Sequence, residues 1–365
     1  MGLKCGIVGL PNVGKSTLFN ALSNNKAEAA NFPFCTIEPN VGVVTVPDGR
    51  LGILEDLVNP KQVIPTTIEF VDIAGLVKGA SKGEGLGNKF LANIREVDAI
   101  IHVVRCFEDE NVVHVAGTID SVFDRDVIDY ELQQRDIESV ESKIKKSSKI
   151  AQSGDSEART HMVVLEEILQ TLKDGKNVRM LEHDDKQVEA YADLFLLTVK
   201  PVIYVANVSE SDLHTGNKQV DELKEAIKDE DSKLILVSAS IEAQIAELED
   251  REEQEMFLEE YGLKESGLSQ LIKASYDLLN LITYFTAGEQ EVRAWTITRG
   301  WKAPQAAGVI HTDFEKGFIK AEVIKLSEYQ KYGSELACKE AGKMAIEGKE
   351  YVVKDGDVMH FRFNV

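Results

Sequence analysis

The feature that most constrains this chain is a glycine-rich segment near its N-terminus. Residues 9–16, Gly-Leu-Pro-Asn-Val-Gly-Lys-Ser, fit the phosphate-binding pattern G-x-x-x-x-G-K-[ST]. The apolar run 4–8 predicts a buried strand before the loop, and residues 17–22 have helical apolar spacing after it. A loop between a strand and a helix N-terminus offers unpaired backbone N–H groups and a positive dipole end, which favours polyphosphate binding.

The residues of this loop are predicted to bind a nucleotide. Lys15 can reach the β- and γ-phosphates and acts in catalysis, and the Ser16 hydroxyl can ligate Mg²⁺. The glycines allow the backbone to curl without a Cβ clash. The predicted nucleotide-binding residues of the loop are Asn12, Val13, Gly14, Lys15, Ser16 and Thr17.

Composition excludes several classes of protein. A chain of 365 residues should hold two or three domains, and no apolar stretch approaches the roughly 20 residues that span a bilayer. The N-terminus does not resemble a signal peptide, and the four cysteines are scattered without a C-x-x-C pair. We therefore expect a cytoplasmic protein that has no membrane partner.

The charge is unevenly distributed. The chain carries 41 basic and 62 acidic residues, a net charge of −21, whereas residues 282–365 hold 12 of each sign. An acidic body repels nucleic acid, so we expect no DNA binding. A local basic patch remains compatible with this balance.

Two further segments predict partners for Mg²⁺. Thr36 lies in a loop between two prolines, where it can be a metal ligand that senses the γ-phosphate or an ordinary polar residue. Asp72 ends an apolar run and opens a D-x-x-G element, so it is expected to hold Mg²⁺ through water. Gly75 can present its N–H to the γ-phosphate. The next position, where a glutamine would orient water, is Leu76, which cannot form a hydrogen bond.

These motifs carry a family resemblance. Residues 72–80, Asp-Ile-Ala-Gly-Leu-Val-Lys-Gly-Ala, with the glycine-rich run 83–91, resemble the Obg family of translation-factor GTPases, and within it the YchF (Obg-like ATPase) branch. The resemblance extends over nearly the whole chain. The family has a leucine at the position of Leu76. The resemblance therefore implies that hydrolysis proceeds without a glutamine that orients water.

Two histidines lie on or after the strand that follows the D-x-x-G element. His102 lies inside an apolar strand, residues 98–105, and is expected to be a packed core residue. In the sheet order that the resemblance implies, this strand neighbours the first one, so the loop after it approaches the phosphates. His114 in that loop is a candidate for handling the attacking water, and an ordinary surface histidine is the equal alternative.

A helical insertion is predicted in the middle of the chain. Helical apolar spacing runs from Asp126 to about Ile150, and a second helix carries Met162 to Leu172, after a turn at 153–156. A further helix over about 186–197 is expected to return to the core. Lys143, Lys145, Lys146 and Lys149 cluster near the tip. They form either a solvated helix face or a phosphate-contacting patch.

The strand at 200–207 resumes the nucleotide fold and ends in Asn207-Val208-Ser209-Glu210, where a GTPase has N-K-x-D. That aspartate accepts two guanine hydrogens, whereas Glu210 is one methylene longer, and Val208 replaces the lysine that covers the base. Losing a bidentate charged pair costs enough to set base choice. The resemblance implies a preference for ATP over GTP, with Asn207, Val208, Glu210 and Ser238 at the base.

Short alternating strands around one helix predict a small α+β module at the C-terminus, which resembles the TGS domain, a ubiquitin-like β-grasp. The predicted fold is an α/β P-loop NTPase (G-domain) with an inserted antiparallel helical hairpin and a C-terminal β-grasp domain. The expected boundaries are 1–125 and 198–281 for the nucleotide-binding domain, 126–197 for the insertion and 282–365 for the TGS domain.

We therefore expect a slow, Mg²⁺-dependent ATPase switch that associates with the ribosome or with structured RNA. Two alternatives are an Obg-type GTPase, which the Asn207–Glu210 segment disfavours, and a nucleotide-sensing adaptor with incidental hydrolysis, which Leu76 keeps open. A redox role for Cys35 has no support beyond its place beside Thr36.

Overall fold

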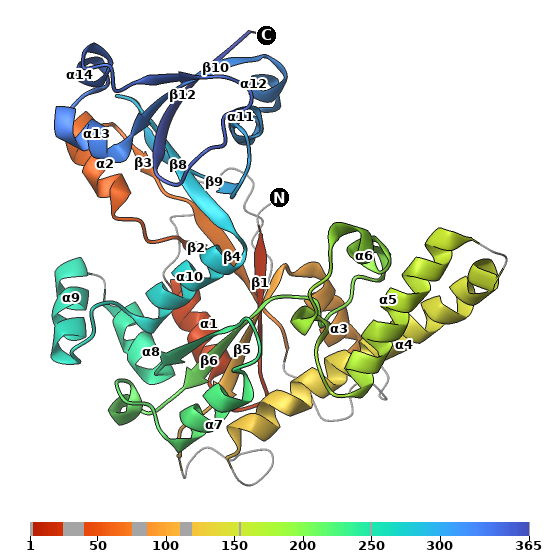
Figure 1. Cartoon of the computed structure of the whole chain (residues 1–365). Helices are drawn as coiled ribbons and strands as arrows, with labels where there is room; N and C mark the ends of the chain where they lie inside the picture. Colours follow the sequence, from red (N-terminus) through yellow and green to blue (C-terminus); the bar gives the residue numbers. More distant parts are fainter. Residues whose placement is uncertain are drawn as a thin grey trace. The chain divides into compact units, whose positions relative to one another are not determined.

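The computed structural model describes residues 3–24, 40–74, 86–109, 119–152, 155–248 and 250–364 (Figure 1). These residues form two compact units. The first unit holds the described residues up to Asn24, from Asn40 to Gly42 and from Glu69 to Leu271. The second holds Val43 to Ile68 and the described residues from Ile272 onward.

Most of a six-stranded sheet of order β2-β4-β1-β5-β6-β7 lies in the first unit, although Val43–Thr45 of β2 and the first two residues of β4 are assigned to the second. Pairing is parallel from β4 through β1, β5 and β6 to β7. β5 and β6 are buried along their whole length, as the continuous apolar runs predicted. The strands are β1 (Lys4–Val8), β2 (Val41–Thr45), β4 (Thr67–Asp72), β5 (Ala99–Arg105), β6 (Val202–Asn207) and β7 (Lys233–Val237).

Helices connect these parallel strands and place their loops at one edge of the sheet. The expected neighbours β1 and β5 are paired, with Ile7 opposite Ile101. The helices of this unit outside the insertion are α1 (Lys15–Asn24), α3 (Leu86–Glu96), α7 (Lys218–Ala226), α8 (Ala239–Glu247), α9 (Arg251–Glu260) and the start of α10 (Gly267–Leu278). The predicted strand over 234–240 ends at Val237, because Ala239 already opens α8.

The predicted hairpin is present as α4 (Ser121–Gln152) and α5 (Ser156–Lys173), which lie side by side (Figure 1). Asp155 caps α5, since its carboxylate accepts a hydrogen bond from the Ala158 N–H at 3.0 Å. The apolar seam is the expected one, with Val140 of α4 buried among Val164, Leu165 and Ile168 of α5.

The expected single helix over 186–197 is wrong. The segment contains α6 (Asp185–Glu189), a 3₁₀ turn η3 (Ala192–Leu194) and Phe195 at φ 49°. α6 already ends at Glu189. Further along, the buried carboxylate of Asp136 accepts the backbone N–H groups of Leu197 and Thr198 at 2.9 and 2.8 Å, and this long-range contact holds the end of the segment outside a helix.

The second unit contains a sheet of order β11-β10-β12-β8-β9-β3. β8 and β9 form an antiparallel hairpin, β12 pairs parallel with β8, and β10 pairs antiparallel with β12. This order, with α11 packed on one face, is the β-grasp arrangement that the sequence predicted. The elements are β3 (Val63–Ile64), β8 (Leu281–Ala287), β9 (Val292–Thr298), α11 (Ala303–Ile310), α12 (Thr312–Lys316), β10 (Phe318–Lys325), α13 (Leu326–Tyr332), α14 (Glu335–Glu340), β11 (Ala345–Glu347) and β12 (Asp357–Phe363).

Residues 43–68 lie in this second unit, although the predicted boundary placed them in the nucleotide-binding domain. Within them α2 (Arg50–Val58) buries Leu51 and Leu54 against Phe285. β3 pairs with β9. The apolar residues of α2 find their partners more than 200 positions away in the sequence, and local periodicity cannot reveal such a partner. The other predicted domain boundaries stay predictions.

Candidate nucleotide site

The glycine-rich loop joins β1 to α1, as predicted, and its glycines are there because other backbone and side-chain atoms come close. A Cβ on Gly9 would lie 2.7 Å from the carbonyl oxygen of Val103 in β5. Gly14 has φ +92°, and a Cβ there would lie 2.2 Å from Nδ2 of Asn207. Asn12 also has a positive φ of 65°. The loop is thus held tightly against β5 and the end of β6.

Asn207 joins the two halves of the site. Its side chain is buried, donates through Nδ2 to the carbonyl of Val13 at 2.9 Å and accepts at Oδ1 from the N–H of Ala239 at 3.0 Å. It therefore connects the phosphate loop, the end of β6 and the start of α8. Because both ends of the amide are used, Asn207 holds these loops in place, which the sequence pattern alone did not show.

Lys15, predicted to act in catalysis, and Asp72, predicted to hold Mg²⁺, meet in the structure. Lys15 and Asp72 form an ion pair, with 10% and 18% of their side chains exposed. Their elements are brought together by the pairing of β1 and β4, in which Ile7 lies opposite Asp72. Ser16 and Thr17 are exposed in the first turn of α1. A carboxylate and a helix-terminal hydroxyl are the hard oxygen donors that suit Mg²⁺.

A cavity of about 770 Å³ opens beside this loop. The predicted residues Asn12, Gly14, Thr17, Asn207, Val208, Glu210 and Ser238 all line it. Val208 is 2% exposed, and Glu210 is an exposed residue at the start of a 3₁₀ turn, η4 (Glu210–Asp212). The Ser240 hydroxyl lies 3.5 Å from Oε1 of Glu210. The end of β6 and the start of α8 thus form the wall that the sequence assigned to the base.

Phe107, Glu108 and Asp109, directly after β5, also line the cavity. The sequence predicted that the loop after this strand approaches the phosphates, but it did not assign these three side chains to the site. The buried Arg105 organises this stretch by donating to the carbonyls of Phe107 at 3.2 Å and Asp109 at 3.4 Å. Its guanidinium also lies 4.5 Å from the centre of the Phe107 ring. The position of β5 between β1 and β6 was the available signal, since it places the loop after β5 between the phosphate loop and the base wall.

Some predicted residues lie outside the described part of the chain. These are Thr36, Gly75 and His114, together with Leu76 and Cys35. His102, expected to be a core residue, is 2% exposed, and burial lowers its pKa to about 4. It is therefore neutral near pH 7 and packs with its ring 5.4 Å from that of Tyr204.

A buried charged cluster lies beside His102, where the helical insertion meets β5 and β6. Arg179 contacts Asp129 at 3.4 Å, Glu230 at 3.0 Å and the Tyr204 hydroxyl at 3.2 Å. Arg125 contacts the other oxygen of Glu230 at 2.7 Å. Burial alone would raise the pKa of Asp129, but the two arginines outweigh it and hold that pKa below its ordinary value.

Two family models match the chain. Residues 4–151 match the 50S ribosome-binding GTPase family, and residues 281–364 match the C-terminal domain family of YchF-type GTPases, described as a protein of unknown function. The loop, the parallel sheet and the cavity at its edge define a P-loop NTPase with a G-domain.

Full-length relatives place the chain more closely. It is 56% identical to the ribosome-binding ATPase YchF of Bacillus subtilis over 100% of both chains, and 56% identical to that of Escherichia coli O157:H7 over the same share. The solved YchF GTPase of Schizosaccharomyces pombe superposes with a TM-score of 0.89 at 42% identity, covering 99% of this chain and 98% of that one. The chain belongs to the YchF family.

Proposed function

We propose that this chain is a Mg²⁺-dependent P-loop ATPase switch that prefers ATP to GTP, hydrolyses it slowly and associates with the ribosome. The names of its bacterial relatives, ribosome-binding ATPases, support this proposal. The observation that carries the nucleotide choice is the wall of the cavity. Val208 is buried where a GTPase has a lysine, and Glu210 stands where it has an aspartate.

The chemistry of the site follows from its residues. The N–H groups of the loop and of the first turn of α1 bind phosphate oxygens, and Lys15 exchanges its partner Asp72 for the β- and γ-phosphates. Ser16 and Asp72 would hold Mg²⁺, with Thr36 as the further predicted ligand. The metal supplies charge neutralisation on the phosphates when bound.

Nucleotide choice is tested by titrating the purified protein with ATP and with GTP. ATP should bind at least about tenfold more tightly, or about 1.4 kcal/mol, because no lysine–aspartate pair is present to read guanine. Glu210→Asp should narrow the difference by shortening the side chain at the cavity edge. Lys15→Ala should lower the affinity for ATP and for GTP to a similar extent. Equal affinities of the wild-type protein for ATP and GTP would contradict the proposal.

Hydrolysis is tested separately by measuring turnover. We expect a slow intrinsic rate, since Leu76 cannot orient water, and no turnover in Lys15→Ala or Ser16→Ala. His114→Ala should lower kcat and leave ATP affinity nearly unchanged, as expected for a group that acts in the transition state. Hydrolysis by this variant at the wild-type rate would show that His114 takes no part in the reaction.

For ribosome association, Lys145 and Lys146 of the predicted lysine patch are the residues to test. Lys143 is ion-paired with Asp193, whereas Lys145 and Lys146 are exposed on α4. A Lys145→Glu/Lys146→Glu variant should co-sediment less with ribosomes and lose part of the salt dependence. The matched control is Lys218→Glu/Lys224→Glu, which changes two exposed lysines on α7. An equal loss of ribosome binding in the two variants would show a general effect of charge. It would contradict a specific role of the hairpin lysines in ribosome binding.

The C-terminal domain is better tested by point substitutions than by removing residues 282–365. Leu51 and Leu54 pack against Phe285 and Val358 in the second unit, so a shortened chain would expose these leucines. Reduced ribosome binding by such a chain would then report misfolding as well as a lost surface.

A further inference from the structure

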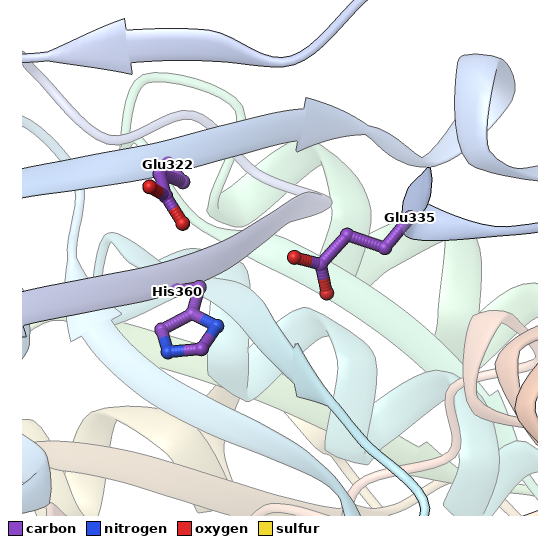
Figure 2. Close-up of side chains that lie close together, drawn as sticks. All are labelled: Glu322, Glu335 and His360. Carbon is purple, nitrogen blue, oxygen red and sulfur yellow. The ribbon is translucent and has the colours of Figure 1, made fainter. Parts of the chain in front are cut away.

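A second cavity, of about 600 Å³, lies within the second unit, and three side chains that commonly ligate metals face it together. They are Glu322 of β10, Glu335 of α14 and His360 of β12 (Figure 2). One ligand atom from each lies within 4.8 Å of the other two. The predicted nucleotide-binding residues all lie elsewhere, in the first unit or in the stretch outside the described residues.

The fold holds two of these side chains in register. Glu322 and His360 are directly opposite each other in the antiparallel pair of β10 and β12, so their side chains share one face of the sheet. Glu335 is the first residue of α14, whose N-terminus is capped by the Ser334 hydroxyl, which accepts from the Ala337 N–H at 3.2 Å. The three side chains therefore come from three separately anchored elements.

Arg362 orients the first carboxylate. It donates to Oε2 of Glu322 through Nη2 at 2.9 Å and Nε at 3.2 Å, and this hydrogen bonding lowers the pKa of Glu322. Oε1 of Glu322 pairs at 3.5 Å with the ammonium of Lys320, whose side chain is 37% exposed. A pair of this length with a partly solvated lysine is weak, so a metal ion can displace it. A hydrogen-bonded outer partner on a ligating carboxylate is a common feature of metal sites.

We propose that Glu322, Glu335 and His360 bind one divalent transition-metal ion, of which Zn²⁺ fits best. One imidazole and two carboxylates suit zinc better than Mg²⁺ or Ca²⁺, which prefer oxygen ligands alone. At metal–ligand distances of about 2.0–2.2 Å, tetrahedral ligand atoms lie roughly 3.4 Å apart. The three groups lie within 4.8 Å of one another, so small side-chain movements suffice to bring them to this separation. His360 is exposed and Glu335 has a flexible side chain, which permits these movements.

The test is calorimetric titration of metal-free, nucleotide-free full-length protein with Zn²⁺. We expect His360→Gln and Glu335→Gln to weaken one binding event by at least about tenfold, within the range seen when groups around a metal are changed. The matched control is Glu340→Gln, an exposed glutamate at the other end of α14, which should bind like wild type. Zinc bound at the nucleotide site contributes equally to all four proteins.

Co²⁺ provides a second measurement that does not depend on affinity alone. Its visible absorption should show nitrogen coordination in wild type and in Glu340→Gln, and should lose that signature in His360→Gln. Circular dichroism of each variant confirms folding. Identical zinc isotherms and cobalt spectra for wild type, His360→Gln and Glu335→Gln would overturn the proposed site.

Discussion

The two units differ in what they bury. The first unit encloses charged and polar side chains in its interior, among them His102, Arg105, Asp129, Asp136 and Glu230. The second unit is packed mainly by apolar clusters on the two faces of its sheet, and its fully buried charge is Asp357, which accepts from the Tyr351 hydroxyl at 2.7 Å and pairs with Lys325.

This difference reflects what each unit must hold in place. In the first unit, the loops that follow the parallel strands lie beyond the sheet, where strand pairing no longer holds the backbone. Buried polar side chains hold these loops in place instead. Asn207 holds the phosphate loop and α8, and Asp136 holds the backbone at 197–198. In the second unit, the register between paired strands sets which side chains lie side by side, as it does for Glu322 and His360. Single polar substitutions should therefore cost more in the first unit.

The largest expected effect is in the buried charged cluster of the first unit. Arg179→Met should lower the free energy of unfolding by about 3–5 kcal/mol, because Asp129 and Glu230 would keep buried charges without this partner. Denaturant unfolding measures it. The control is Arg135→Met, which breaks the exposed pair with Glu138 and should cost at most about 1 kcal/mol. Similar values for the two variants would refute the contrast between buried and exposed pairs.

A pH-dependent effect should come next. Burial raises the pKa of Glu242 to about 7, and its Oε1 accepts the Gly267 N–H at 2.7 Å. Since the folded pKa lies above the ordinary value of 4.5, the stability due to the protonated carboxyl is present below about pH 4.5 and is lost as pH rises to about 7. The loss is roughly 3 kcal/mol.

Glu242→Gln should remove this fall, because the amide does not titrate. The measurement is the free energy of unfolding from pH 4.5 to pH 8, relative to wild type, which cancels contributions from other groups. Glu247→Gln, an exposed change on the same helix, is the control. A wild-type pH profile in Glu242→Gln would mean that another group carries the dependence.

A smaller effect is expected from the close approach at the phosphate loop. Gly14→Ala adds a Cβ 2.2 Å from Nδ2 of Asn207 at φ +92°, so the bond from Asn207 to Val13 must shift. ATP affinity should fall by about tenfold to a hundredfold, equivalent to about 1.4–2.7 kcal/mol. Gly52→Ala in α2, where a Cβ meets nothing within 4 Å, is the matched control and should leave affinity unchanged. Unchanged binding by Gly14→Ala would show that the loop adapts.

The smallest expected effect is at a helix cap in the second unit. Ser334→Ala removes the acceptor for the Ala337 N–H and should cost about 1 kcal/mol of stability. In the first unit, Asn217 caps α7 and also donates to the carbonyl of Cys106 at 2.7 Å and to Asp212 at 2.8 Å. Asn217→Ala should therefore cost more than Ser334→Ala, and the reverse order in thermal unfolding would weaken the comparison of the two units.

The sequence by itself determined the phosphate loop, the strands that end in Asp72 and Asn207, and the helical hairpin. Each of these depends on local rules: glycine where backbone curls, continuous apolar runs in buried parallel strands, and a 3.6-residue period in helices. The structure therefore agrees with these predictions almost to the residue, with β1 at Lys4–Val8 and β6 ending at Asn207.

Only the tertiary structure decided which distant residues meet. Residues 43–68 belong to the second unit because α2 packs on its sheet. The helix expected over 186–197 already ends at Glu189, and Asp136 holds the backbone at 197–198 outside it. The sequence predicted that the loop after β5 approaches the phosphates, but only the packing shows that the Phe107 side chain lines the cavity there. Glu335 faces His360 because α14 begins beside the sheet. Such contacts join residues far apart in the chain, and no periodicity or motif encodes them, since they depend on how complete elements pack.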